Sequence, residues 1–156
     1  MNVIICGSRE FLDFKFMYSF LDKFFDKLMD VEKIQKEDIK IYCGKARGAD
    51  CLGEQWGKMN SIESIPFPAK WDTDGKFDRG AGIKRNAEMV ETADITIAFF
   101  DNVETNGTSD TIKRSVKKGI PVVVLKNKKI HQKFNFEKYS NKDEENDETY
   151  SGNNTL

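Results

Sequence analysis

The amino-acid sequence predicts an α/β fold: a Rossmann-like three-layer sandwich whose five-stranded parallel sheet has the order 3-2-1-4-5, with helices on both faces. Short apolar runs alternate with helix-like segments, which is typical of parallel strands joined by right-handed crossovers. The 156 residues, 38% of them hydrophobic and 33% charged, suffice for one soluble core. We therefore expect a single domain over residues 1–138.

Five apolar runs supply the predicted strands. The run at 2–6 is nearly uninterrupted, as expected of a strand that helices cover on both sides. Pro66 should place the third strand at an edge of the sheet or end it. The segment 133–136 is a further candidate for an edge strand. The five predicted strands are 2–6, 39–43, 62–67, 94–100 and 120–125.

Four predicted helices connect these strands. Asp13 can cap the first helix, whose aromatic residues at four-residue spacing indicate core packing. Gly119 can end the fourth helix as its C′ residue. In the third helix, Ile83 and Val90 belong to the stripe expected to be buried. The helices are predicted at about 14–30, 49–60, 79–93 and 108–118.

Composition narrows the classes of function. The three cysteines form no C-x-x-C pair and the chain has one histidine, so neither a zinc site nor histidine catalysis is indicated, and we expect no metal or cofactor. The N-terminus resembles no signal peptide and no apolar run approaches the length of a membrane span, so we expect a cytoplasmic protein. Residues 139–156 carry five acids and one lysine, a net charge of −4, and are expected to be disordered. Since the whole chain has a net charge of −1, residues 1–138 carry +3, which suits a small anionic ligand but is weak for duplex nucleic acid.

Polar and glycine-rich segments follow four of the predicted strands. Parallel strands end at the same edge of a sheet, and ligands bind beyond that edge where the strand order reverses, here between the first and fourth strands. GSRE offers Gly7 for a sharp turn, the Ser8 hydroxyl and the Arg9 guanidinium for a phosphate. An ordinary strand-to-helix turn also explains this tetrapeptide. GKARGAD adds Gly44, Arg47, Gly48 and Asp50, the last in the first turn of a helix.

The segment NGTSDT, residues 106–111, is the most phosphate-like element. Asn106 and Gly107 precede a predicted helix start, where unpaired backbone N–H groups attract anions, and Thr108 can cap the helix or bind the anion. The spacing matches neither a Walker loop nor a G-x-G-x-x-G fingerprint. Its position at the predicted order reversal favours a ligand.

Asn86 falls inside the buried stripe of the third helix, next to Arg85. An unpaired buried amide costs about 1 to 3 kcal/mol, so Asn86 must have hydrogen-bond partners. Those partners can be strand-end carbonyls or a ligand. Arg85 is expected at the mouth of the same crevice.

Taken together, these motifs resemble the YspA-type proteins of the SLOG superfamily, which includes the DprA/SMF proteins and the LOG cytokinin-activating phosphoribohydrolases. The matching motifs are GSREFLD (7–13), GKARGAD (44–50), PAKWDTDGK (68–76), GAGIKRNAEM (80–89) and NGTSDTI (106–112) followed by GIPV.

The resemblance implies a site for a nucleotide or a nucleotide-derived molecule such as an ADP-ribose derivative. Arg85 and Met89 match the R-x-x-x-M helix of LOG enzymes, and Gly107 and Thr108 match their Gly-Thr phosphate loop. LOG enzymes carry a catalytic glutamate where this chain has Thr111, which puts phosphoribohydrolase activity in doubt. The nearest carboxylate is Asp110.

Three functions follow from these observations. In the first, Gly107 and Thr108 hold a phosphate and Trp71 covers the base or ribose. If this site is an enzyme, Arg85 orients the phosphate while Asp110 or Glu104 assists cleavage of an N-glycosidic bond. The second function is a binding module or sensor without turnover. The third, single-stranded DNA binding, has a thin basis here, and the resemblance further implies a homodimer or higher homo-oligomer.

Overall fold

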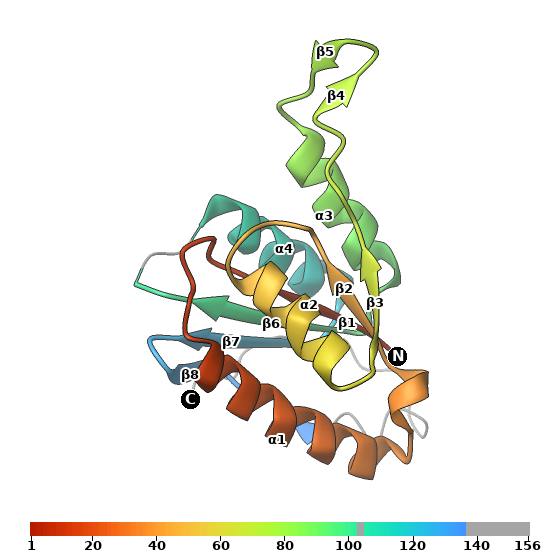
Figure 1. Ribbon diagram of the computed structural model, residues 1–156, viewed down its shortest axis with the longest axis vertical. Coiled ribbons are helices and arrows are strands. Elements are labelled where there is room, and N and C mark those ends of the chain that lie inside the picture. The colour runs from red at the N-terminus through yellow and green to blue at the C-terminus, as the bar shows by residue number, and fades with distance from the viewer. Residues whose placement is uncertain (103–104, 137–156) are drawn as a thin grey trace.

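The computed structural model describes residues 1–102 and 105–136 and shows a sheet between two helix layers (Figure 1). Among these residues no helix is both long and apolar enough to cross a membrane. The strands are β1 Asn2–Gly7, β2 Lys40–Cys43, β3 Glu63–Pro66, β4 Asp72–Thr73, β5 Lys76–Phe77, β6 Ile95–Phe100, β7 Val122–Lys126 and β8 Lys129–Gln132. The helices are α1 Phe14–Glu32, the 3-10 helix η1 Lys36–Asp38, α2 Ala49–Met59, α3 Ala81–Thr92 and α4 Asn106–Lys118.

The main sheet has the order β3-β2-β1-β6-β7-β8. Its first five strands are parallel, so the predicted order of the five strands is confirmed. The order reverses between β1 and β6, where Ile5 pairs with Ile97. Pro66 ends the edge strand β3, as its missing N–H group requires.

Alternate side chains of each strand are buried on opposite faces of the sheet. In β1, Val3 and Ile5 pack with α1 and α2 in one core cluster, whereas Ile4 and Cys6 pack with α3 in the other. Successive strand side chains point to opposite faces, so a nearly continuous apolar run is what two-sided coverage demands. Figure 1 shows α1 and α2 on one side of the sheet and α3 and α4 on the other.

The ends of α1 and α4 follow local capping chemistry. The Asp13 carboxylate accepts a hydrogen bond from the backbone N–H of Phe16 at 3.1 Å, as predicted for the N-cap of α1. Gly119 ends α4 in the left-handed conformation, with φ at 80°, which also confirms its predicted place. The start of α4 differs, because Thr105 is the N-cap and Thr108 lies within the first turn of the helix.

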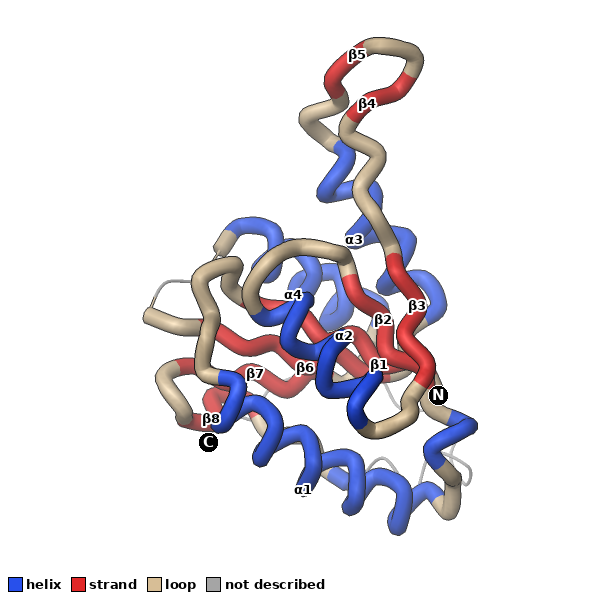
Figure 2. Tube along the Cα trace, viewed as in Figure 1, coloured by secondary structure: helices blue, strands red, loops and turns tan. Residues whose placement is uncertain are grey.

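Two hairpins were not predicted, so the five-stranded, all-parallel sheet was incomplete. The sixth strand, β8, pairs antiparallel with β7 through a two-residue turn, and the candidate strand at 133–136 does not form. The strands β4 and β5 form a separate hairpin that projects beyond the sheet (Figure 2). Its turn residues Asp74 and Gly75 have φ values of 54° and 73°, the signature of a type I′ turn.

The first turn of α3 also differs from its prediction. Ile83 was expected in the buried stripe, yet 53% of its surface is exposed. Figure 1 shows the N-terminal end of α3 extending past the sheet toward the β4–β5 hairpin, and although Ala81 in this turn is buried, no residue of the turn belongs to either core cluster. From Asn86 onward the helix packs on α4 and β1, and Asn86, Met89 and Val90 are buried.

Candidate functional site

A cavity of about 280 Å³ lies at the order reversal of the sheet, beyond the carboxyl end of β1 and beside the start of α4. We call it the first cavity. Segments from β1, the loop after β2, α2, α3 and α4 meet there, although they are far apart in the sequence. Its lining residues are Cys6, Gly7, Arg9, Ala46, Asp50, Arg85, Asn86, Met89, Thr105, Asn106, Gly107, Thr108 and Thr111.

A second cavity of about 530 Å³ adjoins the first, and both are lined by Arg9, Ala46 and Arg85. Its remaining lining residues come from the loops after β2 and β3 and are Gly44, Lys45, Arg47, Pro68, Ala69 and Trp71. The indole of Trp71 is 42% exposed and stacks on Phe77 of the hairpin, with ring centroids 6.0 Å apart and planes 11° apart. One face of an aromatic platform is therefore supported by the β4–β5 hairpin.

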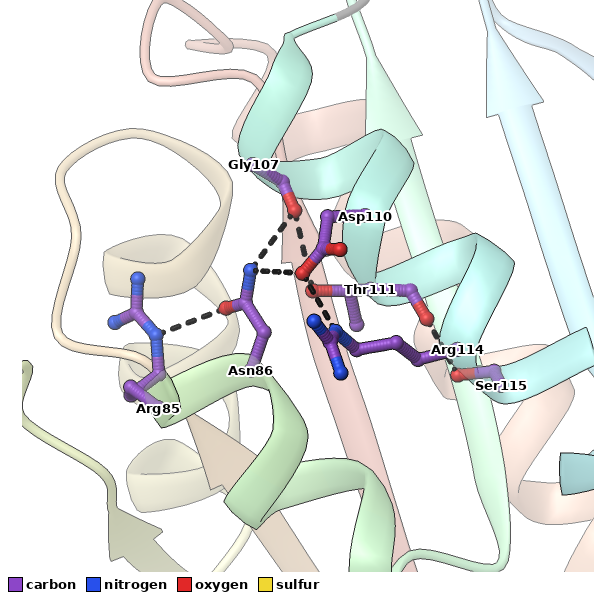
Figure 3. Close-up of polar contacts among 7 residues, drawn as sticks. All are labelled: Arg85, Asn86, Gly107, Asp110, Thr111, Arg114 and Ser115. Carbon is purple, nitrogen blue, oxygen red and sulfur yellow. Dashed lines mark hydrogen bonds and ion pairs between the residues drawn. The ribbon is translucent and has the colours of Figure 1, made fainter. Parts of the chain in front are cut away.

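Arg85 connects α3 to the loops that follow β2 and β3. Its Nε donates to Oδ1 of Asn86 at 2.9 Å (Figure 3), and its Nη1 donates to the carbonyls of Gly44 and, at 3.5 Å, Phe67. A Cβ atom at residue 44 would lie 2.4 Å from Nη1 of Arg85, so only glycine permits this approach. The guanidinium is consequently held at the wall shared by the two cavities.

Asn86 joins α3 to the first turn of α4. Its Nδ2 donates to the carbonyl of Gly107 at 3.1 Å and to the carboxylate of Asp110 at 3.2 Å (Figure 3). The buried amide therefore has its partners within the protein, as the cost of an unpaired buried amide requires. They are a helix carbonyl and a carboxylate, whereas strand-end carbonyls or a ligand had been expected.

The first turn of α4 faces the first cavity. The N–H groups in the first turn of a helix have no intrahelical acceptor, so those of Asn106, Gly107 and Thr108 are potential donors to an anion. Thr108 is buried, and its hydroxyl donates to the carbonyl of Gly7 at 2.9 Å, which ties α4 to β1. A Cβ atom at Gly107 would meet nothing within 4 Å. Packing therefore does not require a glycine there, unlike Gly7, where a Cβ atom would lie 2.0 Å from the carbonyl oxygen of Phe99.

Asp50 supplies the carboxylate of the first cavity. It lies in the first turn of α2, is 6% exposed, and accepts a hydrogen bond from the Gly44 N–H at 3.1 Å. Burial raises its pKa from 3.8 to about 6, although Arg85, the backbone N–H groups of Gly44 and Ala46, and Arg9 oppose this shift. The carboxylate is thus ionised at neutral pH and easily protonated below it.

Comparison with known proteins places this site in a family. The model of the YspA, cpYpsA-related SLOG family matches residues 1–73, which include β1, the loop after β2 and α2. The gene 61 protein of Mycobacterium phage D29 is 30% identical over 128 residues, which cover 78% of this chain and 94% of that protein. The chain belongs to the YspA, cpYpsA-related SLOG family. No solved structure matches it.

Most of the residues predicted for the SLOG site do line the two cavities. Eight of the fifteen line the first cavity and five line the second, with Arg9 and Arg85 common to both. Those that line at least one cavity are Gly7, Arg9, Gly44, Arg47, Asp50, Trp71, Arg85, Asn86, Asn106, Gly107 and Thr108.

Four predicted residues are not among the lining residues. The Ser8 hydroxyl accepts from the Glu10 N–H, and its carbonyl accepts from Phe11 and Ala49, so Ser8 shapes the loop. A Cβ atom at Gly48, whose φ is 76°, would lie 2.4 Å from the Ser8 carbonyl oxygen, so Gly48 serves packing. Asp110 pairs with Arg114 at 2.8 Å and accepts a hydrogen bond from Asn86 (Figure 3), and it is not among the residues that line the first cavity. Glu104 lies outside the described residues.

Sequence reasoning missed several lining residues that carry little chemical signature. Lys45 was not singled out, and it pairs with Glu54 at 2.9 Å, while the predicted Arg47 pairs with Glu10. Cys6 was not singled out for the site either; burial raises the pKa of its thiol well above the usual range, so the thiol stays protonated. The other lining residues not singled out are Ala46, Pro68, Ala69 and Thr105, whereas Met89 and Thr111 were noted only for their positions in the LOG motifs.

Proposed function

We propose that this SLOG protein binds a nucleotide or nucleotide-derived ligand, such as a nucleoside monophosphate or an ADP-ribose-like molecule, at the carboxyl-terminal rim of its sheet. The observation that carries the proposal is the first cavity itself: a hollow at the order reversal that has a helix N-terminus on one side and Arg9 and Arg85 on another. Helix N-termini and arginines both favour anions, and phosphate is the group they most often bind.

The two adjoining cavities suit the two ends of a nucleotide. The N–H groups of the first turn of α4 and the guanidinium of Arg9 can hold a phosphate in the first cavity. The indole of Trp71 can cover the base in the second cavity, since stacking tolerates any base. Arg85 already donates three hydrogen bonds within the protein, so its part is to supply positive charge and to keep the wall in place.

A ligand panel on the melting curve tests this proposal. AMP, GMP, ADP-ribose and cyclic AMP should be added to the full chain, and at about a hundredfold excess over Kd a true ligand stabilises by about 2.7 kcal/mol. Arg9→Ala should weaken binding of that ligand by about tenfold or more, because a hydrogen bond to a charged group contributes about 1.5 to 3 kcal/mol. Arg79→Ala, an exposed arginine outside both cavities, is the matched control. If none of the four nucleotides moves the curve, the proposal is wrong.

Cleavage of an N-glycosidic bond is a second candidate for the same site. The observation that favours it is the Asp50 carboxylate in the first cavity, whose pKa of about 6 lies close to the range of a general base. Asp110 is engaged by Arg114 and Asn86, which makes it a weaker candidate than expected. Incubation with nucleoside monophosphates, followed by chromatography for free base, decides between the two functions: a binding module releases none.

A further inference from the structure

The first cavity combines groups that favour an anion with a group that favours hydrogen-bond donors. Arg9 and the first turn of α4 offer positive charge and N–H donors, whereas Asp50 offers only acceptor oxygens when ionised. Among the described lining residues Asp50 carries the one carboxylate. A phosphate placed against it would be repelled, so a ligand that fills this cavity must present hydrogen-bond donors to Asp50 and its anionic group elsewhere.

The hydrogen bonds within the protein do not use all of the acceptor positions of the Asp50 carboxylate. A carboxylate has about four acceptor positions on its two oxygens. The backbone N–H groups of Gly44, at 3.1 Å from Oδ2, and of Ala46 use part of that capacity. Arg85 attracts the carboxylate electrostatically, but its own hydrogen bonds go to Gly44, Phe67 and Asn86. Acceptor capacity therefore remains on a buried side chain that lines the cavity.

The order of groups in a nucleotide decides which of its donors reaches Asp50. The sugar lies between the phosphate and the base, and in the protein Asp50 lies in the smaller cavity that also holds the start of α4, whereas Trp71 lies in the adjoining one. With the phosphate at α4 and the base at Trp71, the sugar falls beside Asp50. Its hydroxyl groups are the donors available at that point.

We propose that Asp50 accepts hydrogen bonds from the sugar hydroxyls of the bound nucleotide, so that the site selects ribonucleotides over their deoxy analogues. This inference rests on the proposed function, since it needs a nucleotide in the first cavity. It specifies the ligand class further, because a free phosphate or a phosphopeptide has no hydroxyl pair to offer.

Binding of AMP is compared with binding of 2′-deoxy-AMP, 3′-deoxy-AMP and 2′,3′-dideoxy-AMP by calorimetry at pH 7.5. The full chain should bind AMP about 10- to 100-fold more tightly than the dideoxy analogue, the range expected for hydrogen bonds to a charged acceptor. Asp50→Asn should reduce this preference to less than about threefold. Asp26→Asn, which removes an exposed carboxylate on α1 that lines neither cavity, should leave it unchanged.

Each result of this comparison decides the inference. Equal binding of AMP and dideoxy-AMP by the unaltered protein overturns it while leaving the proposed function intact. Absence of binding by AMP and its three deoxy analogues overturns the inference, and the proposed function is then decided separately by the panel of AMP, GMP, ADP-ribose and cyclic AMP. If Asp50→Asn fails to fold, as judged by circular dichroism, the experiment uses Asp50→Ser instead, which keeps an acceptor for the Gly44 N–H. If the folded variant keeps the full preference for the ribose, another residue recognises the sugar and the inference is wrong.

Discussion

Asp50 shows how a single side chain can reduce the stability of the protein that carries it. Desolvation raises its pKa from 3.8 to about 6 even though the positive charges of Arg85 and Arg9 lie close and two backbone N–H groups point at it. The buried Cys6 thiol beside it stays neutral and cannot compensate. The ionised carboxylate thus destabilises the folded protein at neutral pH, and such perturbed pKa values are common at functional sites.

This cost predicts a specific dependence of stability on pH. The folded pKa of Asp50 exceeds its unfolded value, so the cost of the ionised carboxylate is present in full above about pH 6 and disappears as the pH falls toward 4. Relative to Asp50→Asn, the free energy of unfolding of the ligand-free protein should therefore rise by about 2 kcal/mol between pH 7.5 and pH 4.5. Urea denaturation of both proteins across this range measures it. A difference between the two proteins that does not vary with pH would contradict the assignment.

Residue roles were the harder part of the site to predict from the sequence. That Asn86 needs partners followed from burial alone, but the identity of those partners depends on how α3 and α4 pack. Asp110 looked available because it follows the Gly-Thr pair, yet it lies one helical turn from Arg114 and forms an ion pair with it. The i,i+4 spacing of these opposite charges was visible in the sequence, and it was the signal that Asp110 would be engaged in an ion pair.

At the scale of the element, α4 contains a glycine near its N-terminus that the packing of the helix does not require. Gly107 lies in a helix, where glycine is unfavourable, and no atom outside its neighbourhood would meet an added Cβ atom within 4 Å. Gly119, at the other end of α4, has a left-handed backbone that requires glycine. Under the proposed function, Gly107 is therefore a constraint of the ligand, whereas Gly119 is a constraint of the fold.

Alanine at each position tests this separation. Gly107→Ala should keep or raise the unfolding free energy, by up to about 1 kcal/mol, because alanine favours a helix. It should also weaken nucleotide binding about tenfold, since a methyl group beside the N–H donors hinders a phosphate. Gly119→Ala should do the reverse, with a stability loss of about 1 kcal/mol and unchanged affinity. Thermal melts with and without nucleotide measure both effects, and unchanged affinity in Gly107→Ala would remove α4 from the site.

Elements with strong periodicity were predictable, and short hairpins were less so. Five strands and their order followed from apolar runs separated by helices. The β4–β5 hairpin is two residues per strand, too short for alternation to appear, although the Asp74-Gly75 pair is a recognised hairpin signal. The turn before β8 is formed by Asn127 and Lys128, both with positive φ, and lysine gives no such signal.

For the whole molecule, charge is divided between the described domain and the acidic segment that follows it. Residues 139–156 carry a net charge of −4 and lie outside the described residues; within the described residues, the two core clusters and the side chains packed against them extend from Met1 to Phe136. We propose that the domain over 1–138 is complete without this segment. We further propose that it forms a homodimer, which light scattering can measure against the 17.9 kDa chain.

Deletion of residues 139–156 should leave the melting temperature unchanged, because no described core residue is removed. It should also strengthen binding of an anionic nucleotide, since the net charge of the chain changes from −1 to +3. That gain should shrink as salt is added, as for any long-range attraction. Calorimetry at low and physiological ionic strength tests this, and a large fall in melting temperature would show that the domain extends further.

The β4–β5 hairpin has an implication for how this protein can diversify. It is inserted between β3 and α3, carries one ring of the Trp71–Phe77 stack, and shares no residue with either core cluster. An insertion of this kind can be exchanged, lengthened or shortened with little penalty to folding. Under the proposed function, a change in this one peripheral module would alter the contact to the base and leave unchanged the residues proposed for the phosphate and the sugar.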